Sequence, residues 1–167
     1  MIIALVVNTT VLFSSFSLSP TAANSEWVKF SDTKKAKFEI LFPQKPTVSK
    51  DKDDWRLIAT LTEPVTNFYV GIKFYPAPLT DQGLRDAAQS YMDGMAKTLN
   101  EKPTTPTEMQ FNGGLCLEYN YSGMGMKSIK RIFYKGNVWY ELTVNPITGD
   151  IPKAETEKFF GSFKFLK

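Results

Sequence analysis

The stretch GLCLEYNYSGMGMKSIKRIFYKGNVWYELTV, residues 114–144, decides the fold, because it predicts three consecutive antiparallel strands. Gly136-Asn137 supplies a two-residue turn, which pairs Phe133 with Tyr140 and Tyr134 with Trp139 across the second hairpin. The three strands therefore form a meander with one predominantly apolar face.

The first hairpin contains two glycines, and we expect Gly123, Met124 and Gly125 to form a three-residue loop. This loop places Glu118 opposite Lys130, so that an acid meets a base on one face.

The same pairing puts Arg131 on the apolar face between Leu117 and Leu142, where an unpaired guanidinium would be costly. Either the strand end is exposed there or a carboxylate meets the guanidinium, with Glu108 and Glu157 as unranked candidates. Arg131 is thus a candidate for a buried ion pair, the preferred interpretation, or for a ligand contact.

Other segments predict further strands and two helices. Three stretches alternate with a period of two: KFEILFP, WRLIATLTEP and NFYVGIKFYP. A Thr80/Asp81 cap opens an amphipathic helix, and a short helix runs from Lys153 to about Phe160. Helical spacing defines the apolar face of the first helix, which carries Leu84, Ala87, Ala88, Tyr91, Met95 and Leu99.

The heptad SGMGMKS, residues 122–128, superficially resembles a phosphate-binding loop, but its glycine spacing fails and strand periodicity follows it. We interpret it as a hairpin tip that carries a candidate partner contact at Met124, Met126 and Lys127. Methionine is common at adaptable binding surfaces, although a single exposed apolar side chain is also ordinary.

Composition excludes several function classes. The 167 residues carry 20 basic and 17 acidic side chains in an interspersed pattern, which predicts no nucleic-acid binding. No histidine is present, which removes histidine-dependent catalysis and most zinc sites. Cys116 is the only cysteine, so no intrachain disulfide forms. We predict no catalytic residues, no metal and no cofactor.

The N-terminal segment predicts an export signal. Residues 1–25 contain no charged side chain and include two apolar runs followed by small residues. Cleavage after Ala23 would leave residues 24–167 as a single domain without a transmembrane segment. No Lys or Arg precedes the apolar run, and the alternative is an uncleaved anchor, although polar residues interrupt a segment already short for a span.

The pattern and order of these elements resemble the PsbP-like superfamily over residues 27–165. The residues that carry the resemblance are FEILFPQKP, a middle helix, the meander above and a last helix ending FFGSFKF. The resemblance implies an α+β fold, with a central antiparallel sheet of about six to eight strands flanked by helices on both faces. It also implies a mostly non-enzymatic group: extrinsic photosystem II subunits or assembly factors, bacterial periplasmic proteins and effector chaperones.

We therefore expect an exported, non-catalytic module that binds or stabilises a partner protein or membrane-associated complex. The expected location is periplasmic or extracellular, or the thylakoid lumen in a photosynthetic source, and a monomer is the working expectation. One alternative is an effector chaperone. The other is a small-molecule or lipid binder with a pocket between helix and sheet, for which Tyr91, Met95, Trp139 and Tyr140 are the candidate lining or else ordinary core.

Overall fold

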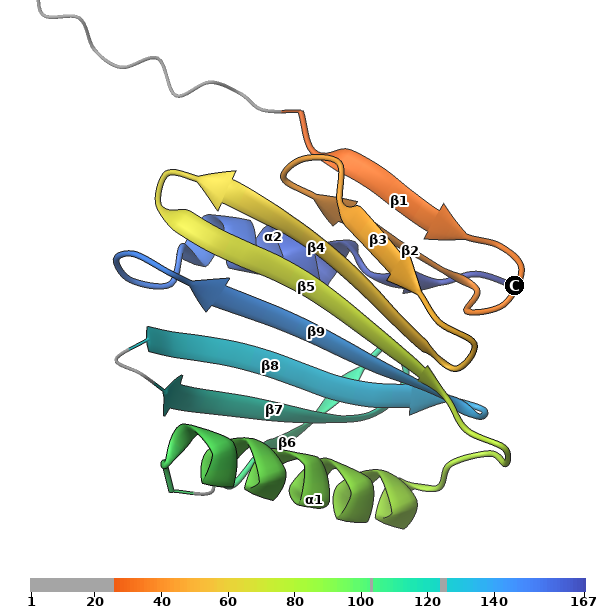
Figure 1. Ribbon diagram of the computed structural model, residues 1–167. Helices are drawn as coiled ribbons and strands as arrows, with labels where there is room; N and C mark the ends of the chain where they lie inside the picture. The colour runs from red at the N-terminus through yellow and green to blue at the C-terminus, as the bar shows by residue number, and fades with distance from the viewer. Residues whose placement is uncertain (1–25, 103, 124–125) are drawn as a thin grey trace, which may run out of the picture.

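The computed structural model describes residues 26–102, 104–123 and 126–167. Ten strands and two helices occur in this part of the chain (Figure 1). In chain order they are β1 (Val28–Asp32), β2 (Phe38–Phe42), β3 (Thr47–Lys50), β4 (Asp54–Thr62), β5 (Val65–Phe74), α1 (Asp81–Leu99), β6 (Thr107–Phe111), β7 (Gly114–Gly123), β8 (Met126–Lys135), β9 (Val138–Pro146), α2 (Lys153–Ser162) and β10 (Lys164–Phe165).

Seven of the strands form a central antiparallel sheet in the order β3-β4-β5-β9-β8-β7-β6. Helix α1 lies on one face of this sheet and α2 on the other, as Figure 1 shows. A second sheet of order β1-β2-β10 packs on the α2 side. The predicted α+β architecture, with helices on both faces of an antiparallel sheet, is confirmed.

The register of the second hairpin is the predicted one, since Phe133 pairs with Tyr140 and Tyr134 with Trp139. The predicted register of the first hairpin is wrong by one residue. Gly123 pairs with Met126, so only two residues separate the strands and both lie outside the described part of the chain. Because strand side chains alternate between faces, a shift of one residue exchanges every cross-strand partner.

The corrected register resolves the position of Arg131. Its cross-strand neighbour is Glu118 rather than Leu117, and its Nε donates to Glu118 Oε2 at 2.8 Å. Glu108 and Glu157 are not its partners: Glu108 instead forms an ion pair with Arg85 of α1 at 2.7 Å. Lys130 faces Tyr119 on the α1 side of the sheet.

Helix α1 begins as predicted, with the Thr80 hydroxyl accepting a hydrogen bond from the Gly83 N–H at 3.1 Å. The helix is rotated relative to the predicted face, because its buried residues are Leu84, Ala88, Met92 and Ala96. Tyr91 consequently lies at the edge of the helix and is 39% exposed. As a result, the Tyr91 ring lies at the flank of α1, where it contacts the Trp139 ring of β9.

Aromatic side chains dominate the core between the α2 face of the large sheet and the small sheet. Phe163, directly after α2, stacks on Phe38 with ring centroids 5.6 Å apart and meets Phe133 edge to face at 4.9 Å. Tyr140 lies parallel to Phe133, and its hydroxyl donates to the Ala36 carbonyl of the β1–β2 connection. Phe159, Phe160 and Phe163 thus pack on the sheet as predicted.

Replacing Phe163 with alanine should destabilise the protein by about 3 to 5 kcal/mol, because the substitution opens a cavity among rings from both sheets. Urea unfolding followed by circular dichroism would measure the loss. Ile147→Ala is the control: Ile147 is 48% exposed, and its truncation should change stability by less than about 0.5 kcal/mol. Equal effects would contradict the packing described here.

Candidate functional site

A cleft lies between α1 and the half of the sheet that the helix leaves uncovered. Because α1 packs over β7 and β8, the same face of β4 and β5 stays open beside it. The cleft has a volume of about 650 Å³. Its lining residues are Asp54, Arg56, Tyr69, Gly71, Ile72, Lys73, Tyr75, Ala87, Ser90, Tyr91, Trp139 and Glu141.

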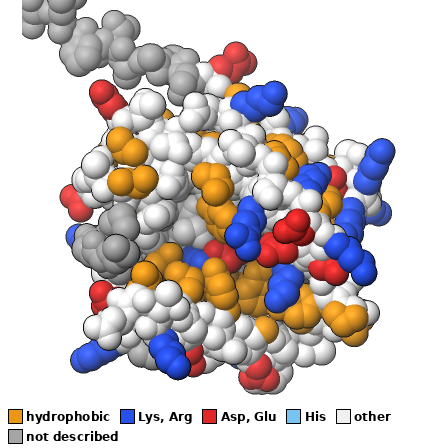
Figure 2. Space-filling view, in the orientation of Figure 1, with side chains coloured by type: hydrophobic (Ala, Val, Ile, Leu, Met, Phe, Trp, Pro, Cys, Tyr) orange, Lys and Arg blue, Asp and Glu red, His pale blue; other side chains and the backbone are white. Residues whose placement is uncertain are grey.

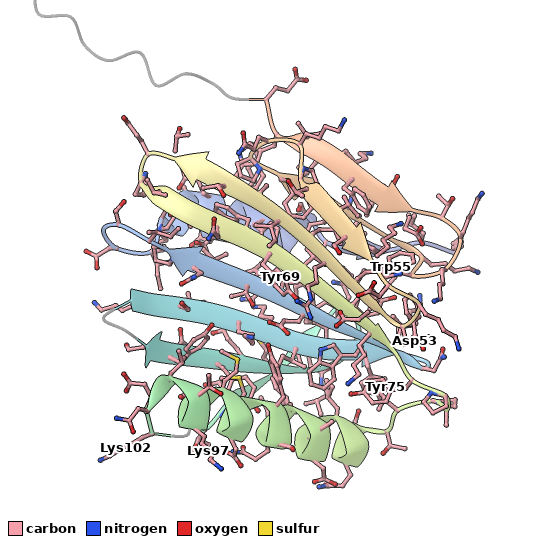
Figure 3. The ribbon with its side chains drawn as sticks, in the orientation of Figure 1. Asp53, Trp55, Tyr69, Tyr75, Lys97 and Lys102 are labelled. Carbon is pink, nitrogen blue, oxygen red and sulfur yellow. The ribbon has the colours of Figure 1, made fainter. Side chains whose placement is uncertain are left out.

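Figure 2 shows hydrophobic side chains gathered along the sheet-side edge of α1, with charged side chains of both signs beside them. Figure 3 places Tyr69 partway along β5 and Tyr75 beyond its end, near the start of α1. The residues of α1 that line the cleft, Ala87, Ser90 and Tyr91, lie in the middle of the helix, and aromatic residues occur along the length of the cleft.

One cross-strand row forms the floor of the cleft. Gly71 pairs with Arg56 on β4 and with Glu141 on β9, so a glycine separates a guanidinium from a carboxylate. A Cβ atom at position 71 would lie 2.8 Å from the Tyr69 hydroxyl oxygen, which shows that the Tyr69 ring leans over the glycine. Gly71 therefore provides the space that this ring occupies.

Three more aromatic side chains surround the floor. The Trp139 ring meets the Tyr91 ring edge to face at 6.3 Å and approaches the Tyr75 ring at 6.4 Å. The Lys73 Nζ lies 5.4 Å from the centroid of the Tyr75 ring. These contacts join β5, α1 and β9 into one aromatic wall.

A buried ion pair fixes the position of Glu141. Its side chain is 8% exposed and that of its partner Lys130 is 3% exposed. All its hydrogen bonds from described residues reach Oε1: the donors are Lys130 Nζ, the Tyr91 hydroxyl at 3.3 Å and the Thr143 hydroxyl at 3.1 Å. Lys130 Nζ also donates to the Tyr91 hydroxyl at 3.0 Å. The network attaches α1 to the sheet at the edge of the cleft.

Burial and the negative charge of Glu141 raise the pKa of Tyr69 and of Tyr91 well above the ordinary value for tyrosine. Both hydroxyls therefore stay protonated near neutral pH and act as hydrogen-bonding groups. The ammonium of Lys130 and the carboxylate of Glu141 in this network form an ion pair with each other.

Replacing Lys130 with methionine should destabilise the protein by about 3 to 5 kcal/mol, because the substitution leaves the Glu141 carboxylate buried without its cation. The double variant Lys130→Met/Glu141→Leu should lose less than Lys130→Met alone, since no buried charge remains. Urea unfolding of both variants measures the coupling. Arg85→Ala, which breaks the exposed pair with Glu108, should cost less than about 1 kcal/mol and serves as the control.

Comparisons with known proteins bear on the fold. Neither protein-family models nor curated protein sequences give a match. The solution structure of cyanobacterial PsbP (CyanoP) from Synechocystis sp. PCC 6803 matches with a TM-score of 0.58 and 16% identity, over 90% of this chain and 98% of that one. The protein has a PsbP-like fold.

A crystal structure from Bacteroides thetaiotaomicron also matches, with a TM-score of 0.54 and 16% identity over 83% of this chain. The match spans 48% of the Bacteroides chain, about half of its length. At these identities the likeness concerns the fold, and the features of the cleft come from this chain alone.

The four residues predicted to line one pocket lie in different places in this PsbP-like fold. Tyr91 and Trp139 line the cleft, whereas Met95 lies farther along α1 in a shallow hollow that also includes Tyr91. Tyr140 does not belong with them, because it belongs to the core on the opposite face of the sheet. Neighbouring residues of one strand point to opposite faces, so Trp139 and Tyr140 cannot line one pocket.

The residues predicted to form a partner contact at the tip of the β7–β8 hairpin are only partly described by the structure. Met124 lies outside the described residues, as does the side chain of Met126. Lys127 is exposed and its Nζ lies 3.6 Å from the Asp150 carboxylate. An exposed pair of this kind contributes little to stability. The proposed partner contact at the tip stays a prediction.

Arg131 lines a second groove, beside α2, with a volume of about 530 Å³. Its guanidinium lies 4.3 Å from the centroid of the Phe160 ring and 5.4 Å from that of Phe111. Glu118 takes its Nε, so the described structure explains the residue as an ion pair packed on aromatic rings.

Sequence reasoning missed Arg56, Tyr69, Gly71, Lys73 and Tyr75 as cleft residues. Periodicity in WRLIATLTEP and NFYVGIKFYP identifies the apolar face of each strand and assigns no role to the alternate positions. The signal available there was an arginine, a glycine and a tyrosine where a solvated strand face would more often carry small polar residues.

The described residues were also compared with the requirements of a metal site and of a membrane-spanning helix. In residues 26–102, 104–123 and 126–167, no group of three or more metal-ligating side chains is placed to hold a metal ion. Over the same residues, neither helix combines the length and the apolar character that a membrane span requires.

Cys116 is buried in the aromatic core, and burial raises the pKa of its thiol to about 12, although Arg131 nearby acts in the opposite direction. At about pH 8 the thiolate population should be roughly a thousandfold smaller in the folded than in the unfolded protein. Ellman's reagent should therefore react with Cys116 only after addition of urea.

The same pKa difference predicts the sign of the pH dependence. The unfolded chain loses its thiol proton at lower pH than the folded chain, so this group makes the free energy of unfolding fall as pH rises above about 9. Urea titrations of the wild type and Cys116→Ala at increasing pH would isolate the effect. Rapid native labelling at neutral pH would contradict the burial.

Proposed function

We propose that this protein is an exported, non-catalytic binding module that holds a segment of a partner protein in the cleft beside α1. The observation that carries the proposal is the composition of the cleft: Tyr69, Tyr75, Tyr91, Trp139 and Arg56 all line it. Tyrosine, tryptophan and arginine are the residues most enriched where protein interfaces gain their binding energy.

The shape and polarity of the cleft support a peptide segment as its occupant. Both charged and aromatic side chains line it, and it opens onto the exposed face of β4, where Ile58 is 43% exposed. An extended segment could lie along α1 and continue over that face. The closed Lys130–Glu141–Tyr91 network argues against acid/base catalysis here.

Export rests on the N-terminal sequence. Residues 1–25 lie outside the described part of the chain, so cleavage after Ala23 stays a prediction. We propose that the mature protein begins at Asn24 and works in the periplasm or outside the cell, or in the thylakoid lumen of a photosynthetic source. Mass measurement of the protein from its native cells would reveal whether residues 1–23 are removed.

A small-molecule ligand is the second candidate, because the volume of about 650 Å³ falls in the range of ligand pockets. Such pockets are mostly apolar and enclose their ligand, whereas this cleft carries four charged side chains. Native mass spectrometry of the protein from its own cells would reveal a retained small molecule and would favour this candidate.

The partner proposal can be tested by blocking the cleft. Ser90 is exposed on α1 and lines the cleft, so Ser90→Trp should fill it without removing a contact of the core. When the tagged Ser90→Trp variant is isolated from native cells, the amount of partner recovered with it should be at least about tenfold lower than with wild type, because centrally placed interface residues dominate binding.

Gln89→Trp is the matched control, since Gln89 is the exposed neighbour of Ser90 and does not line the cleft. This variant should retain the partner. Equal recovery of one partner by wild type and both variants would show that the partner docks elsewhere, and recovery of no partner by the wild type would contradict the proposal.

A further inference from the structure

The charges in the cleft are not equally available to a ligand. Arg56 forms an ion pair with Asp54 at 3.2 Å, and Glu141 is paired with the buried Lys130. Among the described residues, no carboxylate lies within 4.0 Å of the Lys73 ammonium, and this side chain is exposed at the cleft. Because Arg56 pairs with Asp54 and Glu141 pairs with Lys130, Lys73 is the cation of the cleft that is available to a ligand.

The positive charge of Lys73 lies beside the aromatic residues at one end of the cleft. Lys73 pairs with Trp139 across β5 and β9, and its ammonium lies 5.4 Å from the Tyr75 ring centroid. Tyr75 and Tyr91 both approach the Trp139 ring. The free cation therefore sits at the end of the cleft where Tyr75 and Trp139 meet (Figure 3 labels Tyr75).

The apolar part of the lining is aromatic rather than aliphatic. Ala87 contributes an aliphatic side chain, whereas three tyrosines and a tryptophan contribute rings. The side chain of Ile72 lies in the core on the opposite face of the sheet. Aromatic rings pair with one another in offset and edge-to-face arrangements that add to the gain from buried area. The lining thus favours a ring over an alkyl chain.

We infer that the cleft receives an aromatic side chain lying next to a carboxylate, with the ring packed among Tyr75, Tyr91 and Trp139 and the carboxylate held by Lys73. The inference rests on the proposed function and names the chemistry of the partner segment: an aromatic residue adjacent to an acidic one. A cationic segment fits poorly, since Lys73 faces the opening and both carboxylates of the cleft already have a partner: Arg56 pairs with Asp54, and Lys130 pairs with Glu141.

The test uses three small probes with the full chain. The first, 3-phenylpropionate, carries the ring and the carboxylate. In 3-phenylpropanamide the charge is absent, and in 3-cyclohexylpropionate the aromatic ring is absent. Each probe is titrated to about 20 mM while the backbone amide signals are followed by NMR, because a ligand of this size should bind with a dissociation constant on the order of 4 mM.

We expect 3-phenylpropionate to shift the amide signals of Gly71, Lys73, Tyr75 and Trp139 in a saturable way. It should bind about fivefold more tightly than each of the other two probes, a factor suited to one half-exposed charge pair or one aromatic contact. Lys73→Gln should remove the preference over the amide. Lys97→Gln should leave it intact, because Lys97 is exposed in the last turn of α1, away from the cleft (Figure 3).

Equal affinity for acid and amide would overturn the role of Lys73, and equal affinity for the phenyl and cyclohexyl acids would overturn the role of the rings. Absence of saturable shifts at the cleft would overturn the inference as a whole. If Ser90→Trp nevertheless abolished partner recovery, the proposed function would stand with a different partner chemistry. If the probes bound but Ser90→Trp kept its partner, the cleft would be a ligand site and the partner proposal would fail.

Discussion

Strand β9 lies at the centre of the large sheet and is buried on both of its faces, and this double burial constrains the rest of the structure. One face carries Tyr140, Leu142 and Val144 into the aromatic core. The other carries Trp139, Glu141 and Thr143 beneath the edge of α1. Because a charge buried without a partner is costly, Glu141 requires Lys130 from the neighbouring strand, and this pair in turn fixes Tyr91 and the helix that carries it.

The sequence predicts the fold well where a turn leaves no choice. Gly136-Asn137 permits one loop length, and the register of β8 and β9 is the predicted one. The β7–β8 hairpin offers glycines at both 123 and 125, and local turn chemistry does not decide between loops of two and three residues. The choice depends on which side chains can pack on each face of the sheet, as when Arg131 meets Glu118 instead of an apolar neighbour.

The cleft was less predictable than the fold, for a related reason. Periodicity identifies the apolar face of each element, and this reasoning placed Trp139 and Tyr91 near a pocket. Arg56 and Tyr69, which line the cleft beside α1, lie on the face of their strands that points away from the aromatic core. For that face, periodicity indicates only that its residues are outside the core. The rotation of α1 was equally invisible, since Met92 and Ala96 are as compatible with helical spacing as Tyr91 and Met95.

The width of the large sheet has a consequence for how such a chain can diversify. Seven strands spaced at about 4.8 Å span roughly 29 Å from the first strand to the last, whereas one helix with its side chains is about 10 to 12 Å across. A single helix on this face therefore cannot shield the whole sheet, and a groove along its flank is a geometric by-product of the architecture. Residues on the uncovered face of these strands can change without disturbing the core on the other face, so chains sharing this scaffold can acquire different specificities at little cost to stability.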